Sequence, residues 1–173
     1  MDKILTNLES QDLTGEDLKR ICKNKVDIIP YHTLGNYKNI EDLLGEFGSV
    51  ILLYEIRENF GHYVALFMNG NNDLEFFDSY GFKPDQEIKY ATYNQSNGIP
   101  HLTQLLNKYD KKIVVNTERL QVFHADINTC GRWTSLRILF KKKPLREFIE
   151  LFTKNRQYNG DFWVSALTYL LTN

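Results

Sequence analysis

The stretch Ser49–Ile56 (SVILLYEI) decides the fold, because it is an unbroken apolar run of strand length. Such a run, without alternation of polar and apolar residues, is typical of a strand buried on both faces of a sheet. Two more strand-like segments follow, His62–Met68 (HYVALFM) and Leu74–Ser79 (LEFFDS), and the turn sequence Asn69–Asp73 (NGNND) separates them. The three segments predict an antiparallel meander at the centre of the molecule.

Segments with helical spacing flank this meander on both sides. Thr14 and Asn39 are favourable N-cap residues before apolar-periodic segments, so a helix is expected after each, the second ending at Gly48. The remaining predicted elements are helices at Leu102–Tyr109, Thr129–Lys142, Leu145–Lys154 and Asp161–Leu171, the last capped by Asp161, and a strand at Lys112–Asn116. The predicted fold class is therefore α+β, a central and mostly antiparallel sheet packed by helices, in a single domain over residues 1–173.

The charge balance and the cysteine content exclude several classes of protein. Lys and Arg number 21 against 22 Asp and Glu, so no overall field favours nucleic acid or an anionic membrane. The two cysteines, Cys22 and Cys130, are far apart, which argues against a disulfide-stapled secreted scaffold. Residues 1–10 carry charges and lack a long apolar stretch, so we expect no signal peptide, no membrane span and a reducing, cytoplasmic environment.

Three short motifs at the ends of predicted elements carry residues with complementary chemistry. They are Gly61-His62-Tyr63 at a strand start, Phe77-Asp78-Ser79 at a strand end, and Asn128-Thr129-Cys130-Gly131 at a helix start. The first turn of a helix stabilises a thiolate, because its backbone N–H groups and the positive end of the dipole face the sulfur. An imidazole can take the thiol proton, and a carboxylate can orient the imidazole. Cys130, His62 and Asp78 suit these roles.

The predicted meander permits this arrangement in space. If the second and third strands pair across the turn, His62 lies opposite Ser79 and beside Asp78. Each residue also has an ordinary structural explanation, because a histidine can be a satisfied surface or core residue, Asp-Ser can form a turn, and a cysteine can neighbour a helix cap. The joint occurrence of all three at one edge of the sheet favours the catalytic interpretation.

The order His, Asp, Cys, in Gly-His-Tyr, Phe-Phe-Asp-Ser-Tyr-Gly and Asn-Thr-Cys-Gly-Arg-Trp, resembles the adenovirus-protease and ubiquitin-like-protease clan of cysteine proteases. Within that clan the chain is most similar to the capsid-maturation proteases of virophages and large DNA viruses. The resemblance covers roughly residues 45 to 140. It implies a papain-like or adenain-like fold with the catalytic cysteine at the N-terminus of a core helix.

The resemblance also implies catalytic roles. Cys130 would be the nucleophile, His62 the base and Asp78 the acid that orients His62. The clan uses a glutamine shortly before the cysteine as an oxyanion donor, together with the backbone N–H of the cysteine. Gln121 is the candidate, although it lies nine residues before Cys130. His124 is the competitor, and we favour Gln121 because an amide N–H is a neutral and always available donor.

The predicted function is that of a cysteine endopeptidase that processes viral capsid or other structural precursor proteins through an acyl-enzyme on Cys130. One alternative is an isopeptidase that removes ubiquitin-like modifiers, and another is a catalytically silent binding protein of the same fold. No cofactor, metal site or membrane partner is expected, and we predict a monomer. The need for a peptide or nucleic-acid activator is left open. A viral protein of this kind would act in the virion and in the virus factory of the host cytoplasm.

Other residues are predicted to have supporting roles. The sequence from Tyr80 to Pro100 has no clear period and reads as a surface loop or lid that contacts the substrate. Tyr63 and Trp133 are expected to be buried, and Cys22 is expected to be an inert core or boundary residue. Asn128 precedes the predicted helix, so capping or turn formation is its ordinary role, and lining the cleft is a further one.

Overall fold

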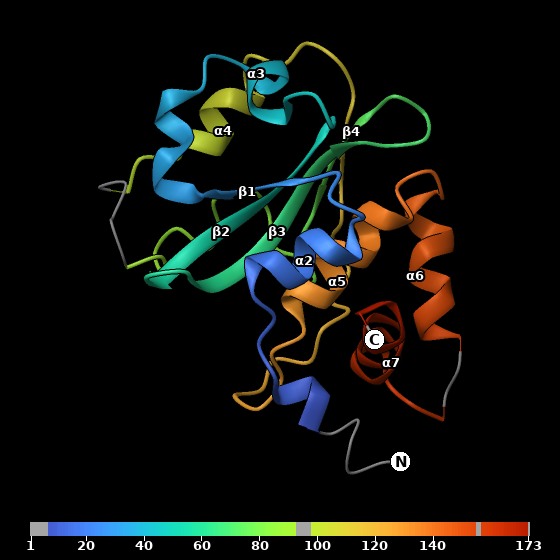
Figure 1. Ribbon diagram of the computed structural model, residues 1–173. Coiled ribbons are helices and arrows are strands. Elements are labelled where there is room, and N and C mark those ends of the chain that lie inside the picture. The colour runs from blue at the N-terminus through green and yellow to red at the C-terminus, as the bar shows by residue number, and fades with distance from the viewer. Residues whose placement is uncertain (1–6, 93–97, 155–156, 173) are drawn as a thin grey trace.

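The computed structural model describes residues 7–92, 98–154 and 157–172, and in these residues it has an α+β fold around one five-stranded sheet. The strands lie in chain order across the sheet, and Figure 1 shows the first four of them. They are β1 (Asp27–Pro30), β2 (Ser49–Arg57), β3 (Phe60–Met68), β4 (Leu74–Phe77) and β5 (Ile113–Val115).

The predicted meander forms the centre of this sheet. β2 pairs antiparallel with β3, and β3 pairs antiparallel with β4. β1 and β5 add in parallel at the two edges, so the sheet is mixed. The α+β prediction is confirmed, and the parallel edge strand β1 is an element that the sequence did not reveal.

Helices cover both faces of the sheet (Figure 1). One face carries α2 (Gly15–Ile21), α5 (Cys130–Leu139), α6 (Leu145–Thr153) and α7 (Gly160–Thr172), and the other carries the 3₁₀ helix η1 (Tyr31–Asn36), α3 (Ile40–Leu44) and α4 (His101–Leu106). Among the described residues, no helix combines the length and the apolar character needed to span a bilayer.

These two layers explain the unbroken apolar run. Ile51 and Leu53 of β2 belong to the core beneath α5, whereas Val50 and Leu52 belong to the core beneath α3 and α4. Alternate side chains of a strand point to opposite faces, so a strand covered on both sides needs apolar residues at every position. Burial of the run on both sides fixes β2 in the interior of the sheet.

The predicted N-caps of two helices are confirmed, whereas the predicted end of one helix and the predicted cap of another are wrong. Thr14 caps α2 with a reciprocal capping box to Asp17, and Asn39 caps α3. However, α3 ends at Gly45, which has a left-handed φ of 56°, and not at Gly48. The first turn of α7 is capped by Asn159, whose Oδ1 accepts a hydrogen bond from the Phe162 N–H.

The predicted strand register was wrong by one residue. Ala65 pairs with Phe77 and Leu66 with Phe76, so continuing the register places His62 opposite Tyr80 and not opposite Ser79. The strand β4 also ends at Phe77, two residues earlier than predicted. Beyond that point β3 is no longer paired with β4, and the chain that carries Asp78 is free to turn toward His62.

Candidate active site

The position of His62 is set by a close contact between β2 and β3. His62 pairs with Tyr54, and the register between the strands shifts at Glu55 and Arg57, which is a β-bulge. A Cβ atom added at Gly61 would lie 1.9 Å from the backbone oxygen of Tyr54, so only glycine fits directly before His62. The Gly-His pair is therefore a geometric unit that holds the imidazole at the end of the sheet.

Cys130 is the first residue of α5, as predicted. A Cβ atom added at Gly131 would lie 3.0 Å from the Leu18 side chain and 3.4 Å from the Tyr63 ring, so a glycine lets α5 pack closely against α2 and β3. Thr134, one turn further on, donates its hydroxyl to the backbone oxygen of Tyr63. These contacts fix the start of α5 beside the strand that carries His62.

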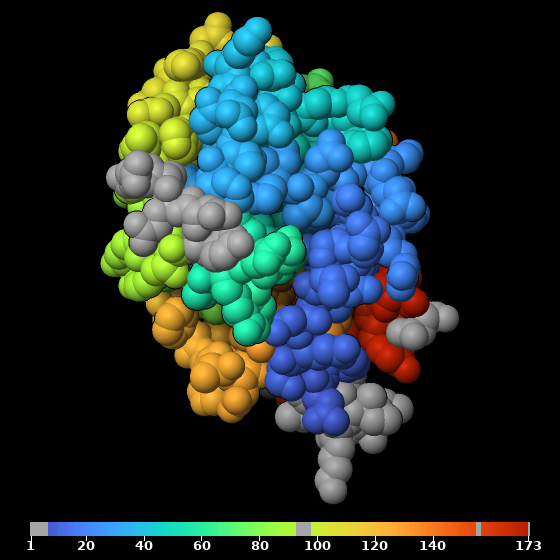
Figure 2. Space-filling view, turned by 60° about the vertical axis from the view of Figure 1, so that its left-hand side comes forward, coloured from blue at the N-terminus to red at the C-terminus, as the bar shows by residue number. Residues whose placement is uncertain are grey.

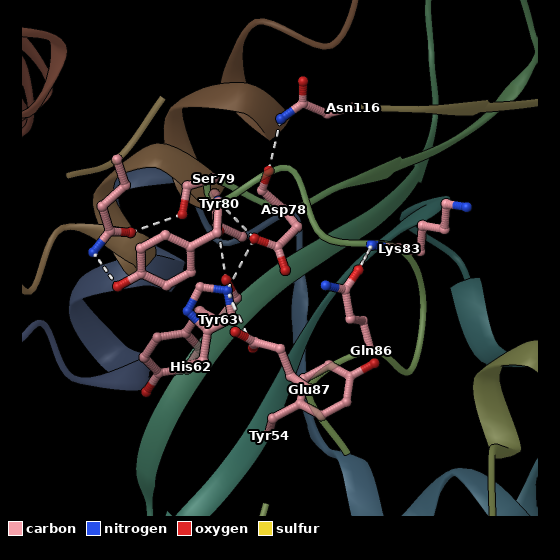
Figure 3. Close-up of polar contacts among 12 residues, drawn as sticks. Tyr54, His62, Tyr63, Asp78, Ser79, Tyr80, Lys83, Gln86, Glu87 and Asn116 are labelled. Atoms are coloured by element: carbon pink, nitrogen blue, oxygen red, sulfur yellow. Dashed lines mark hydrogen bonds and ion pairs between the residues drawn. The ribbon is translucent and has the colours of Figure 1, made fainter. Parts of the chain in front are cut away.

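Asp78 contacts the His62 imidazole at its Nε2 atom. The Nε2 atom of His62 lies 3.2 Å from Asp78 Oδ1, as Figure 3 shows. The same carboxylate oxygen accepts the backbone N–H of Tyr80 at 2.7 Å, and the backbone oxygen of Asp78 accepts the side-chain amide of Asn116 at 2.7 Å. Asp78 is therefore held rigidly, so that it can orient His62 as the sequence predicted.

His62 and Cys130 line the same cavity, and Cys130 affects the pKa of His62. Burial alone would lower the pKa of His62, yet the charge and hydrogen bond of Asp78, together with the hydrogen bond and charge of Cys130, raise it well above its ordinary value. Because Nε2 faces Asp78, Nδ1 is the ring nitrogen left to meet the thiol. The structure thus brings Cys130, His62 and Asp78 together, from α5, β3 and the residues after β4.

Asp161 is a structural anchor of this site that the sequence did not reveal. Its carboxylate is buried and accepts hydrogen bonds from the Thr129 hydroxyl, from Trp133 Nε1 at 2.8 Å and from the Val122 N–H at 2.8 Å. The prediction that it caps α7 was wrong, because its side chain points back to α5. Asp161 joins the start of α5 to the segment that carries Gln121.

Gln121 reaches the site in spite of its distance from Cys130 along the chain. The backbone N–H groups of Leu120 and Gln121 both donate to the Ser79 oxygen, which ties the segment to the residues after β4. The amide of Gln121 donates to the Tyr80 hydroxyl and to the Ile127 oxygen, each at 3.1 Å. Both amide hydrogens are engaged, so Gln121 can serve an oxyanion only by exchanging one of these partners.

The competing residue His124 is placed differently. Its side chain is exposed, it accepts the backbone N–H of Asp126, and it does not line either cavity beside Cys130. Gln121 and Cys130, in contrast, line one cavity together. Of the two candidates for the oxyanion donor, Gln121 has the suitable position.

Two further residues of the site, Tyr80 and Glu87, come from the predicted loop. The Tyr80 ring stacks on the imidazole of His62, with the ring centroids 4.9 Å apart and an angle of 20° between the planes (Figure 3). The Oε2 atom of Glu87 lies 3.5 Å from His62 Nε2. The Phe-Asp-Ser-Tyr motif contains Tyr80, so its position could have been found; no local signal marks Glu87.

Two cavities meet at Cys130. One, of about 430 Å³, lies toward the predicted loop and is rich in aromatic side chains, and the other, of about 500 Å³, lies toward α2. Both are lined by Phe60, Asn128 and Cys130, so Asn128 lines the cleft as predicted. Figure 2 shows this face, on which the tip of the β2–β3 hairpin lies between the N-terminal segment (blue) and the orange segment before α5.

The prediction of a loop at Tyr80–Pro100 is confirmed for the described residues of this segment. The described residues of Tyr80–Pro100 contain turns but no regular helix or strand, and Tyr80, Phe82 and Tyr90 line the aromatic cavity. Residues 93–97 lie outside the described residues. The contact of the Tyr80–Pro100 loop with a substrate stays a prediction.

The remaining predicted residues have structural surroundings, although Tyr63 also lines the cavity toward α2. Cys22 is buried, and burial raises the pKa of its thiol to about 12, as expected of an inert cysteine. Tyr63 and Trp133 are buried in the core beneath α5. His32, a residue of η1, lies 2.9 Å, Nδ1 to Oε2, from Glu55 of β2, which is opposite Gly61 on β3.

The fold and the site define an α+β protein with a Cys–His–Asp cluster open to two cavities. The chain is 38% identical over 150 residues to "Uncharacterized protein V9" of Sputnik virophage, a match that covers 84% of this chain and 86% of that protein. The chain therefore belongs to the same family as this virophage protein. Neither a protein-family model nor a solved structure matches the chain.

Proposed function

We propose that this protein is a cysteine endopeptidase that processes capsid or other structural precursor proteins of a virus. The observation that carries the proposal is that His62, held by Asp78, shares a cavity with Cys130 at the point where two cavities meet. A purely structural role for a buried histidine does not account for a thiol at the start of a neighbouring helix, or for a cavity that borders both residues.

In the first half of the proposed reaction, His62 takes the proton of the Cys130 thiol. The resulting thiolate is stabilised by the first turn of α5 and by the imidazolium, whose Nε2–H is held by Asp78. The sulfur attacks the carbonyl carbon of the scissile peptide bond. The tetrahedral intermediate collapses, the C–N bond breaks, and His62 gives its proton to the departing amine.

In the second half, a water molecule replaces the amine product. His62 removes a proton from this water as it attacks the thioester carbon, the C–S bond breaks, and the product acid leaves. The thiol proton returns from His62 to Cys130. Atoms and charges balance over the cycle, so no cofactor is required.

The oxyanion of each tetrahedral intermediate requires two donors. The backbone N–H of Cys130 is one, because the first N–H groups of a helix have no acceptor within the helix. The Gln121 amide is the other, if the oxyanion displaces the Tyr80 hydroxyl as its acceptor. Tyr80 can compensate, because a hydroxyl is both donor and acceptor and can turn toward another partner.

The membership in a virophage protein family supports a viral substrate. The two cavities, both lined by Cys130, suit a peptide that passes across the site, with a bulky apolar side chain in the aromatic cavity.

The proposal is tested with the purified protein and the structural proteins of its virus, expressed as uncleaved precursors. Incubation with the wild-type protein should produce new N-termini, which mass spectrometry can map. The Cys130→Ala variant should lower the cleavage rate by more than about 10⁴-fold, because removal of a nucleophile leaves only binding and oxyanion stabilisation.

The control is Cys22→Ala, which removes the other thiol and should leave cleavage unchanged. Thermal unfolding of both variants would show whether each is folded. Cleavage by folded Cys130→Ala protein at the wild-type rate would overturn the proposal.

A further inference from the structure

The site contains a second carboxylate that the proposed reaction does not use. Glu87 lies in the turn-rich segment after β4, and only 8% of its surface is exposed. Its Oε2 atom has no hydrogen-bond partner among the described residues, although it points at His62 Nε2 from 3.5 Å. A buried carboxylate oxygen without a partner costs free energy, so its presence requires an explanation.

His62, Asp78 and Glu87 together offer three ligand atoms to one point in space. His62 Nε2 lies 3.2 Å from Asp78 Oδ1 and 3.5 Å from Glu87 Oε2, and all three atoms lie within 4.8 Å of one another. Zinc bound at ~2.0–2.2 Å in a tetrahedron requires its ligand atoms to be about 3.4 Å apart. Figure 3 shows the two carboxylates converging on the same side of the imidazole.

The charges in this cluster are suited to a divalent cation. Two carboxylates face one imidazole, and among the described residues no Lys or Arg forms an ion pair with either of them. Burial raises the pKa of Glu87 to about 7; the charge of His62 opposes the rise and that of Asp78 adds to it. A divalent cation at Nε2 would compete with the proton of Glu87, stabilise the ionised forms of both acidic side chains and give Glu87 Oε2 a partner.

We propose that His62, Asp78 and Glu87 form a binding site for a divalent transition-metal ion of the zinc class. Imidazole and carboxylate together suit zinc better than magnesium or calcium, which prefer oxygen ligands alone. The aromatic cavity is lined by both His62 and Glu87, so the ion can reach the site from solvent. Binding displaces the proton from His62 Nε2 to solvent.

The site also predicts a form of regulation, and this step rests on the proposed peptidase function. A metal on Nε2 leaves the hydrogen of the neutral imidazole on Nδ1, the nitrogen that faces Cys130. This nitrogen then has no lone pair and cannot take the thiol proton. The bound metal therefore inhibits cleavage without contacting the sulfur, and a chelator restores it.

The test is a zinc titration of the Cys130→Ala protein by calorimetry, because this variant cannot bind metal through the thiol. One zinc ion per chain should bind. Adding Glu87→Gln should weaken binding by more than about 10-fold, because even groups that only orient a metal ligand contribute ~10–100-fold. The matched control adds Glu55→Gln, which alters the other His–Glu pair, His32 with Glu55 at 2.9 Å, and should leave zinc affinity unchanged.

Absence of zinc binding by Cys130→Ala, or equal affinity after Glu87→Gln, would overturn the proposal. If Glu87→Gln does not fold, anomalous diffraction from zinc-soaked crystals of Cys130→Ala decides the matter: a peak among the three ligand atoms supports the site, and a peak elsewhere overturns it. Cleavage of precursors by metal-free wild-type protein is a separate measurement. A failure of the peptidase function therefore cannot be mistaken for a failure of the metal site.

Discussion

The two ends of α5 both present polar side chains to the sheet, but they differ in how completely those side chains are paired. Near the C-terminal end, Arg137 and Glu75 are fully buried and form two hydrogen bonds, of 2.7 and 3.0 Å, and Arg137 also donates to the oxygens of Phe140 and Lys143. At the N-terminal end, Glu87 Oε2 has no hydrogen-bond partner and His62 is shared between two carboxylates and a thiol.

This difference separates a structural cluster from a reactive one. A buried ion pair with all its donors and acceptors engaged has one stable protonation state and holds two elements together. A cluster with excess acceptors and a shared proton has several states of similar free energy, which proton transfer and metal binding both require. The predictions below test whether the two ends of α5 differ in this way.

The largest expected effect concerns the thiols. Burial raises the pKa of Cys22 from 9.0 to about 12, so at neutral pH its thiolate fraction is about 1000-fold below that of an ordinary cysteine. Cys130 at the reactive end should therefore react with iodoacetamide more than about 1000-fold faster than Cys22. Mass spectrometry of digested samples taken over time measures both rates. Similar rates would show that the start of α5 does not activate its sulfur.

The second effect is on stability at the structural end. Arg137→Met removes the only cation paired with Glu75 among the described residues and leaves the buried carboxylate with the Asn69 amide, at 3.3 Å, as its neutral donor, so we expect a loss of ~3–5 kcal/mol in the free energy of unfolding. Denaturant titration measures this loss. The matched change at the reactive end, Cys130→Ala, should cost less than about 1 kcal/mol.

The double variant Arg137→Met with Glu75→Gln sharpens the second prediction. Removing both charges should recover much of the lost stability, because the unpaired charge and not the missing contact causes the loss. No recovery in the double variant would mean that Arg137 stabilises the protein through packing against Phe67 and Phe148, over whose rings its guanidinium lies.

The smallest expected effect is a pH dependence at the reactive end. Glu87 keeps its proton in the folded protein up to pH about 7, whereas the unfolded chain loses it near 4.5. The unfolded state binds fewer protons in this window, so Glu87 makes the free energy of unfolding fall as pH rises. Glu87→Gln removes this fall, and the stability of the variant relative to wild type should increase by ~1–3 kcal/mol between pH 5 and pH 7.

Urea titrations of both proteins at several pH values test this prediction. The comparison uses the difference between them, because Asp17 and other carboxyls with lowered pKa values act in the opposite direction and are common to both. A difference that does not change with pH would mean that Glu87 is ionised throughout.

Much of the fold was accessible from the sequence because its signals are local. The apolar run of β2, the cap residues Thr14 and Asn39, and the turn at residues 69–73 each act within a few neighbouring residues. The three residues of the predicted triad were also accessible, because each lies at the end of such an element. Their catalytic roles stay predictions.

The parts that the sequence did not reveal depend on contacts between distant segments. Glu87 is an ordinary surface-type residue in its own segment and becomes a partner of His62 only when the loop folds over β3. Asp161 looks like a helix cap locally, yet its carboxylate accepts hydrogen bonds from Thr129, the residue before α5, and from Trp133 of α5. The one-residue error in register has the same origin, because the turn alone does not fix which residues pair.

The α+β class and the central strands could be predicted from the sequence alone, as could the placement of Cys130, His62 and Asp78 at element ends, because hydrophobic period and capping chemistry are properties of short segments. The three-dimensional structure was needed to show that Gln121, and not His124, shares a cavity with Cys130, and that a second carboxylate faces the imidazole. Burial and charge act through space, and the electrostatic state of a group is set by its neighbours in the folded chain.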